Sequence, residues 1–315
     1  MPRFLLALDY GGTKLSAALT TAHAREWLAL ERIISPPEHN AQYEQRAMLK
    51  LARKILNGKI PAAIGISFGG PVDFARGLVL LSHHVAGWEN IFLRDQWRAE
   101  FGAPVEIDND ANVAALGEFK FGAGRACASL LYVTVSTGVG GGWIVDGKIL
   151  RGADGVAGEI GHTIFDPNGP LCICGRRGCV EVFASGRAIA RIARERLIAH
   201  PRAESRVREL IAAEITAQAV ARAAQDGDEF AQSILDDAAR ALGFGIGTAI
   251  TLLNPERVVI GGGVSKAGEK YFAAVRVAAR ANCLPQMRVE IVPAALGDDA
   301  PLWGAVALAQ EIAQK

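Results

Sequence analysis

The sequence predicts an α/β protein in which one arrangement of strands and helices occurs twice. Short apolar segments typical of strands alternate with segments of helical periodicity. A strand, a glycine-rich turn and a second strand occur near residues 4–19 and again near residues 130–150. A third glycine-rich turn, Gly261–Gly263, follows another strand. We interpret the two strand–turn–strand segments as an internal duplication of architecture.

The first half of the duplication opens with a predicted three-stranded meander. Its strands are expected at 4–8, 15–19 and 27–34, and Pro36-Pro37 ends it. The rest of this half is predicted as a helix at 42–56, a strand at 62–68, a helix at 93–101, a strand at 105–107 and a helix at 111–121.

The second half repeats the pattern and then becomes rich in helices. We expect a strand at 130–135, a glycine-rich turn at 136–142 and a strand at 143–145, closed by the hairpin turn Asp146-Gly147. Helices are predicted at 186–199, 216–225, 228–253, 270–280 and 301–314, with a strand at 257–260 and an edge strand at 289–292. Glycines in the helix 228–253 favour close packing, either in the core or against a partner chain.

Composition excludes several classes of function. The net charge is +1 over 315 residues, so nothing favours binding to nucleic acid or to a membrane surface. No apolar run reaches the ~20 residues that span a bilayer, and the apolar start is stopped by Asp9, too early for a signal peptide. We therefore expect a cytoplasmic protein, in which disulfides are not favoured.

One histidine and three cysteines lie within eighteen residues and predict a metal site. His162, Cys172, Cys174 and Cys179 offer the nitrogen and sulfur ligands that suit tetrahedral Zn²⁺. Four protein ligands leave no position for water, so the zinc would be structural. A cluster of free thiols beside a surface histidine is the alternative. Two acids, Glu159 and Glu181, flank the cluster.

The glycine-rich turns and one aspartate predict phosphate chemistry. After the first strand, Asp9 precedes Gly11-Gly12-Thr13, where backbone N–H groups and a hydroxyl could approach a polyphosphate. Any one such turn could be a simple hairpin. Asp110 follows a strand and opens a helix, a position suited to a general base, although it could also act only as a helix cap.

These segments together resemble the ROK family of sugar kinases and repressors, within the hexokinase–actin-like ATPase fold. The resemblance covers essentially the whole chain and is most specific at Glu159-x-Gly161-His162 and Cys172-x-Cys174-Gly175-x-x-Gly178-Cys179-x-Glu181. The family's repressors carry an added N-terminal winged helix. Because Asp9 lies so close to the start, we expect the kinase branch.

The resemblance implies a two-lobed actin-like ATPase (ribonuclease H-like) fold with a duplicated βββαβα core and the active site in the cleft. We expect residues 1–117 plus 300–315 to form the smaller lobe and 118–299 the larger lobe with the zinc site. Asp110 looks like the catalytic base. The family's other site positions match Gly70, Asn109, Asp110, Glu159, His162 and Glu181 for the sugar, Asp9, Gly11, Gly12, Thr13, Lys14, Thr137, Gly138, Gly261 and Gly262 for the nucleotide, and His162, Cys172, Cys174 and Cys179 for zinc.

The activity that this resemblance implies is an ATP-dependent hexose kinase, with glucose as the expected substrate and Mg²⁺ bound with ATP. An N-acetylglucosamine, N-acetylmannosamine or fructose kinase is the alternative within the class. A sugar-binding regulator without catalysis is the alternative outside it. The resemblance also implies a homodimer or a dimer of dimers.

Two positions depart from the family's pattern. Gly69 stands where a first proline is common, and His84 stands where an asparagine is common before Gly87-Trp88. If position 84 reaches the cleft, we expect the sugar preference to change.

Overall fold

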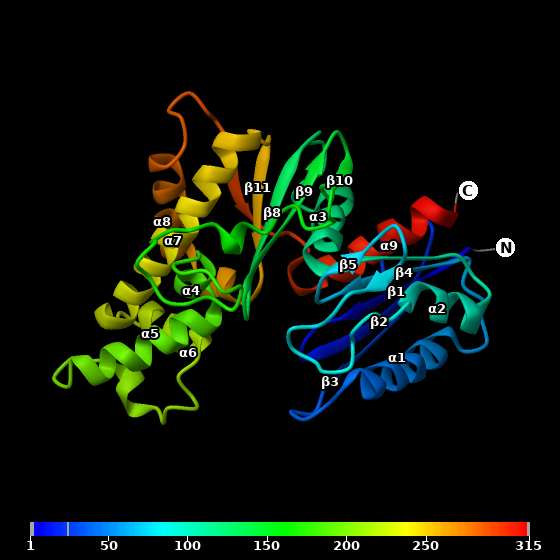
Figure 1. Cartoon of the computed structure of the whole chain (residues 1–315), viewed down its shortest axis with the longest axis horizontal. Helices are drawn as coiled ribbons and strands as arrows, with labels where there is room; N and C mark the ends of the chain where they lie inside the picture. Colours follow the sequence, from blue (N-terminus) through cyan, green and yellow to red (C-terminus); the bar gives the residue numbers. More distant parts are fainter. Residues whose placement is uncertain (1–2, 24, 314–315) are drawn as a thin grey trace. The chain divides into compact units, whose positions relative to one another are not determined.

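The computed structural model describes residues 3–23 and 25–313, which form two compact units (Figure 1). Unit 1 comprises Met1–Ala128, Gly142–Ala157 and Ala294–Lys315, and unit 2 comprises Ser129–Gly141 and Gly158–Pro293. The predicted helix end at Gln314 lies outside the described residues. In the part of the chain that is described, no helix is long and apolar enough to cross a membrane.

The first sheet belongs to unit 1 and has the strand order β3-β2-β1-β4-β7. The meander is confirmed, because β1 pairs with β2 and β2 with β3, both antiparallel. The next two strands run parallel to β1. The elements are β1 (Phe4–Tyr10), β2 (Lys14–Thr21), β3 (Ala29–Ile34), α1 (Ala41–Leu56), β4 (Ala63–Phe68), α2 (Leu93–Phe101), β7 (Val105–Asn109) and α3 (Asp110–Phe121).

The two faces of this sheet pack against different helices, as alternate residues of β4 show. Ile64 and Ile66 of β4 are fully buried in a core shared with Met48 of α1. Between them, Gly65 faces α9 (Ala300–Ala313), where a Cβ would lie 1.8 Å from the Ala305 carbonyl oxygen. Side chains of successive strand residues point to opposite faces, so one strand serves both layers. Only glycine permits so close a helix.

The second sheet repeats the first, with the order β10-β9-β8-β11-β12, and confirms the predicted duplication. In both sheets the first strand of the meander pairs in parallel with a strand reached through a helix-containing connection. The strands are β8 (Leu130–Val135), β9 (Val139–Val145), β10 (Lys148–Leu150), β11 (Arg257–Gly261) and β12 (Glu290–Pro293). The last lies at the sheet edge, as predicted.

One predicted turn is shorter than expected. Residues 139–142 belong to β9, so the turn is confined to residues 136–138. A Cβ on Gly141 would lie 2.6 Å from the Gly158 carbonyl oxygen. A Cβ on Gly142 would lie 2.5 Å from the Ala111 carbonyl oxygen. These glycines therefore serve close backbone packing along a strand, which a run of glycines in sequence resembles but does not distinguish from a turn.

The glycine-rich helix α7 (Glu229–Leu253) packs inside unit 2. A Cβ on Gly243 would lie 2.4 Å from Ala278 Cβ of α8 (Glu269–Ala281), and one on Gly247 would lie 2.6 Å from the Ala279 carbonyl oxygen. These glycines let α7 and α8 approach closely. This face of α7 therefore packs in the core, which is one of the two alternatives expected from the sequence. The other elements are β5 (Val72–Asp73), β6 (Leu78–Val79), α4 (Glu181–Ala184), α5 (Gly186–Ala199), α6 (Ala217–Gln225), and the 3₁₀ turns η1 (Ile160–His162), η2 (Arg206–Glu209), η3 (Gly263–Ala267) and η4 (Gly297–Asp299).

Candidate functional site

The predicted site residues fall into two groups, one in each unit. In unit 1, the β1–β2 turn is closed by a hydrogen bond of 3.1 Å from the Gly11 amide to the Lys14 carbonyl oxygen. Asp9 lies just before it, with only 6% of its surface exposed, and Ser67 Oγ donates to Asp9 Oδ1 over 2.9 Å. Burial raises the pKa of the Asp9 carboxyl to about 6, and the Ser67 hydrogen bond and the Lys14 charge offset only part of that effect.

Gly69 lies close both to the β1–β2 turn and to Asp110. The Gly69 amide donates to the Tyr10 carbonyl oxygen over 2.9 Å. A Cβ built on Gly69 would lie 3.7 Å from the Gly12 nitrogen and also 3.7 Å from Asp110 Oδ2. The turn amide and the carboxylate therefore border one point, which the missing side chain leaves open.

Asn109, and not Asp110, caps α3. Its Oδ1 accepts from the Ala111 amide at 2.9 Å and from the Asn112 amide at 3.4 Å. Its Nδ2 donates to the Gly70 carbonyl oxygen over 3.1 Å, which joins two residues predicted to bind the sugar. The cap is thus supplied by the residue before Asp110. Asp110 is therefore not the N-cap residue, although its Oδ1 also accepts from the Ala111 amide at 2.8 Å.

Sequence reasoning missed the role of Asp108. This carboxylate is 2% exposed and accepts from Arg151 Nε at 2.7 Å, from the Asn109 amide at 2.8 Å and from Asn112 Nδ2 at 3.1 Å. Burial raises its pKa, and the Arg151 charge opposes the shift. Asp108 therefore fixes the strand-to-helix junction that presents the next two residues. The run of Asp and Asn in the sequence was the available signal.

In unit 2, Glu181 is bonded to the predicted second phosphate turn. Its Oε2 accepts from the Val139 amide at 2.9 Å, and a Cβ on Gly138 would lie 2.5 Å from that oxygen. Position 138 must therefore lack a side chain for this contact to form. This hydrogen bond therefore joins a residue predicted to bind the sugar to the turn predicted to bind phosphate.

The four predicted zinc ligands converge. One ligand atom from each of His162, Cys172, Cys174 and Cys179 lies within 4.8 Å of all the others. Cys172 Sγ is 3.6 Å from His162 Nδ1, and the sulfurs of Cys174 and Cys179 are 3.5 Å apart. Separations of this size, with one imidazole and three thiols, fit a tetrahedral metal ion of the zinc type.

Two glycines make this convergence possible. Gly175 and Gly178 have φ of +84° and +73°, which side chains rarely tolerate. A Cβ on Gly178 would also lie 1.5 Å from the Asp166 carbonyl oxygen. The chain can therefore turn back twice between the second and third cysteines.

The thiols differ in how readily they ionise. Burial raises the pKa of Cys172, and raises that of Cys179 to about 12, while the backbone N–H of Arg176 lowers that of Cys174 to about 6. Two buried thiols that resist ionisation beside a third that ionises readily are suited to a cation, which would stabilise all three thiolates.

His162 has a different neighbour on each ring nitrogen. Its Nδ1 faces Cys172, whereas its Nε2 lies 3.8 Å from Glu159 Oε2. Glu159 is exposed. The ring can therefore hold a metal through Nδ1 while Nε2 and the Glu159 carboxylate face the same side, where hydroxyl groups could bind.

The third glycine-rich turn has a packing explanation of its own. A Cβ on Gly261 would lie 2.3 Å from Tyr132 Oη, and one on Gly262 would lie 2.4 Å from the Val135 carbonyl oxygen. Gly262 also has a φ of +86°. Gly262 is therefore required by the close approach of this turn to the backbone of β8, whereas Gly261 leaves room for the Tyr132 side chain. A role of either glycine in nucleotide binding stays a prediction.

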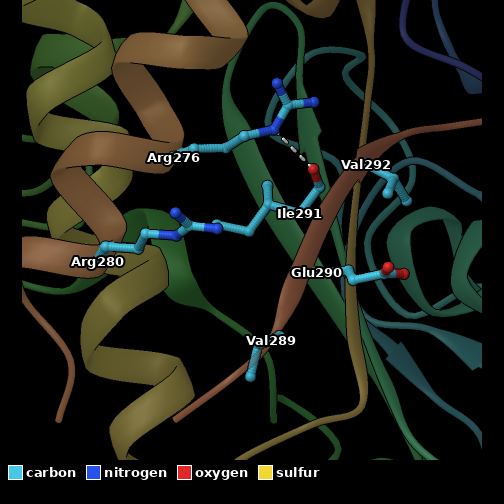
Figure 2. A pocket seen from close by; sticks show the side chains of 6 residues that line it. All are labelled: Arg276, Arg280, Val289, Glu290, Ile291 and Val292. Carbon is cyan, nitrogen blue, oxygen red and sulfur yellow. Dashed lines mark hydrogen bonds between the residues drawn. The ribbon is translucent and has the colours of Figure 1, made fainter. Parts of the chain in front are cut away.

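A shallow pocket lies elsewhere on unit 2, between α8 and β12. Figure 2 shows Arg276 and Arg280 reaching from the helix toward the strand, and Arg276 Nε donates to the Ile291 carbonyl oxygen over 3.0 Å. Arg276 also pairs with Glu269. The pocket contains none of the predicted site residues, and the charge of Arg276 is neutralised within the protein.

The chain matches known proteins over nearly its whole length. A profile of the ROK family matches residues 5–312. A glucokinase of Halalkalibacterium halodurans is 37% identical over 310 residues, which cover 96% of this chain and 93% of that protein. The crystal structure of a ROK family glucokinase from Streptomyces griseus, in complex with glucose and AMPPNP, superimposes with a TM-score of 0.85 at 33% identity and covers 98% of this chain and 99% of that one.

Relatives with other activities also match. An N-acetylmannosamine kinase of Salmonella paratyphi A is 34% identical over 97% of this chain and 98% of that protein. A xylose repressor of Caldicellulosiruptor bescii is 34% identical over 78% of this chain and 61% of its own length. Similarity alone therefore leaves the choice of sugar open within this group.

Proposed function

The chain belongs to the ROK family, and from that premise we propose that it is an ATP-dependent sugar kinase which phosphorylates glucose on its 6-hydroxyl. The likeness to glucokinases over nearly the whole chain supports this activity. The observation that carries the mechanism is the position of Asp110. Its carboxylate borders the same open point as the Gly12 amide, and Asn109 has taken over the helix cap.

Asp110 acts as the general base. It accepts the proton of the sugar hydroxyl as that oxygen attacks the γ-phosphorus in line, and ADP leaves with the bonding electron pair. The backbone N–H groups of Gly12 and Thr13 position the phosphate oxygens, in a turn that the Gly11 N–H closes on Lys14. Mg²⁺ would enter with ATP and supply positive charge, and the buried carboxylate of Asp9, just before the turn, would help to hold it.

The sugar is held by carboxylate, amide and imidazole groups. In this proposal its hydroxyls are bound by residues that the family resemblance implies: Asn109, Glu159, His162 and Glu181. Asn109 uses one N–H of its amide for Gly70, and an amide nitrogen has a second N–H to offer. A structural zinc ion held by His162, Cys172, Cys174 and Cys179 would fix the imidazole, so that its other nitrogen would keep one orientation for a sugar hydroxyl.

A panel of sugars tests the assignment, with ADP release measured for each at saturating Mg·ATP. We expect kcat/KM for glucose to exceed that for N-acetylmannosamine, N-acetylglucosamine and fructose. A higher value for N-acetylmannosamine would change the assigned substrate but would leave the assignment as a kinase unchanged. Tight sugar binding by calorimetry with no ADP release for any sugar would instead favour the regulator, a function that the repressor relatives support.

A further inference from the structure

His84 lies on a turn that is anchored at several points within unit 1. Ser82 Oγ accepts from the amides of His84 and Val85, both at 3.2 Å. Val85 is 3% exposed and Trp88 is fully buried. The Trp88 indole donates to Glu44 Oε2 over 2.6 Å, which ties the turn to α1. His84 itself is an exposed residue, so a fixed backbone holds it at the surface of unit 1.

This imidazole lies against the first glycine-rich turn. A Cβ built on Gly12 would lie 3.2 Å from His84 Cδ2, 3.4 Å from its Cβ and 3.5 Å from its Cγ. The Gly12 nitrogen in turn borders the open point beside Gly69 that Asp110 also borders. Three groups with different chemistry are thus neighbours in one unit: a carboxylate, a backbone amide and an imidazole.

We propose that His84 contacts the phosphoryl group that passes from ATP to the sugar, donating a ring N–H to one of its oxygens. The inference rests on the proposed kinase function and adds a residue to it. A neutral or protonated imidazole has at least one N–H to donate, and hydrogen bonds to charged phosphate oxygens are stronger than those between neutral groups. The position beside the Gly12 turn makes the phosphate, and not the sugar ring, the partner.

The test separates the effect of the shape of the His84 ring from the effect of its hydrogen-bond donor. His84→Phe keeps a flat ring on Gly12 but has no N–H, whereas His84→Gln keeps an N–H donor. His83→Phe is the matched control, because His83 is the exposed neighbour on the same turn. Steady-state rates with glucose and Mg·ATP give kcat and KM. Calorimetry gives the affinities for glucose and for glucose 6-phosphate, a readout that does not depend on turnover.

We expect His84→Phe to lower kcat by roughly 10- to 100-fold, since a hydrogen bond to a charged group is lost. Affinity for glucose 6-phosphate should fall in the same variant, while affinity for glucose stays within about twofold. His84→Gln should recover part of both losses, and His83→Phe should match the wild type.

Three results would overturn the proposal. Wild-type kcat and glucose 6-phosphate affinity in His84→Phe would mean that the imidazole only packs on Gly12. An equal loss of glucose affinity would make His84 a sugar contact. If the wild-type protein phosphorylates no sugar in the panel, the kinase function itself fails and the role of His84 fails with it. The first two outcomes leave the kinase function intact.

Discussion

At the scale of single residues, the division of labour between Asn109 and Asp110 decides how a substitution can be interpreted. Asn109 carries the helix cap and Asp110 carries the candidate base, although both stand at the same strand-to-helix junction. Loss of the first should therefore affect stability as well as sugar binding, and loss of the second should affect catalysis.

We predict that Asp110→Asn lowers kcat by at least about 100-fold, because general-base catalysis is typically worth 10²–10⁴. Affinity for glucose should persist, and the melting temperature should change little because the asparagine keeps an acceptor for the Ala111 amide. The matched variant Asn109→Ala should lose about 1 kcal/mol of folding free energy, measured by urea unfolding. A loss of less than about 100-fold in Asp110→Asn would refute the base assignment.

Asp9 predicts a pH dependence of stability. Its pKa is raised to about 6 in the folded protein, from an ordinary value of 3.8, so the folded state favours the neutral carboxyl. The resulting stabilisation is present below pH 3.8 and is lost as the pH rises through about 6. Without nucleotide or Mg²⁺, the unfolding free energy of the wild type should fall relative to that of Asp9→Asn by about 2–3 kcal/mol between pH 4 and 7. A difference that stays constant with pH would contradict this assignment.

Some residues could be identified from sequence and others could not. The zinc ligands and Asp110 stand in short local patterns, and the structure brings the four ligands together. The contact of His84 with Gly12 joins positions 72 residues apart, and no local pattern specifies such a contact. The sequence identified His84 only as a departure from the family's pattern. Its position becomes informative only once the fold is known.

At the scale of elements, Glu118 of α3 fastens two chain segments that lie far apart in sequence. It is fully buried, and its carboxylate accepts from the amides of Ala123 at 2.7 Å, Leu296 at 2.8 Å and Ala295 at 3.2 Å. The chain first leaves unit 1 after Ala128 and returns to it for the last time at Ala294. Glu118 therefore holds the outgoing and returning segments to the same helix.

Glu118→Ala should lower the unfolding free energy by roughly 3 kcal/mol, because three buried N–H groups lose their acceptor. Glu118→Gln should lose less, since the amide oxygen keeps part of the acceptor capacity. The exposed neighbour Lys120→Ala is the control and should stay within about 0.5 kcal/mol of the wild type. Urea unfolding at pH 7 measures all three, and a wild-type value for Glu118→Ala would exclude a structural role for this carboxylate.

The second prediction at this scale concerns the four predicted zinc ligands. We expect about one zinc ion per chain, and Cys172→Ser should abolish it while Cys283→Ser, outside the cluster, should keep it. Loss of zinc should lower the melting temperature and the affinity for glucose, but not the affinity for Mg·ATP. Elemental analysis and calorimetry on the same preparation measure these quantities. Zinc-free protein that is folded and binds glucose normally would contradict the proposed role of the metal.

Element boundaries were predictable where apolar periodicity was strong, and uncertain where glycine dominated. The helix at 93–101 and the strand at 130–135 have the predicted bounds. Residues 139–142 were expected in a turn but belong to β9, because glycine serves close strand packing as readily as turns. The two-residue strands β5 and β6 were missed, since so short a pairing leaves no periodic signal.

At the scale of the whole molecule, the two sheets have the same strand order, and the ROK family profile covers almost the entire chain. The duplicated fold was predictable because strand–turn–strand patterns recur locally. The domain limits at 117/118 and 299/300, the cytoplasmic location and the homodimer or dimer of dimers stay predictions. Choice of sugar depends on a few contacts, which similarity across glucokinases and N-acetylmannosamine kinases does not resolve.

The most direct test of the central claim is the identity of the phosphorylated product. Purified protein is incubated with Mg·ATP and glucose, and with 6-deoxyglucose as the matched sugar that lacks the acceptor hydroxyl. ³¹P NMR of the products should show glucose 6-phosphate and ADP with glucose, and no ADP above background with 6-deoxyglucose. Phosphate on another hydroxyl, or equal ADP release with 6-deoxyglucose, would contradict phosphoryl transfer to the 6-hydroxyl.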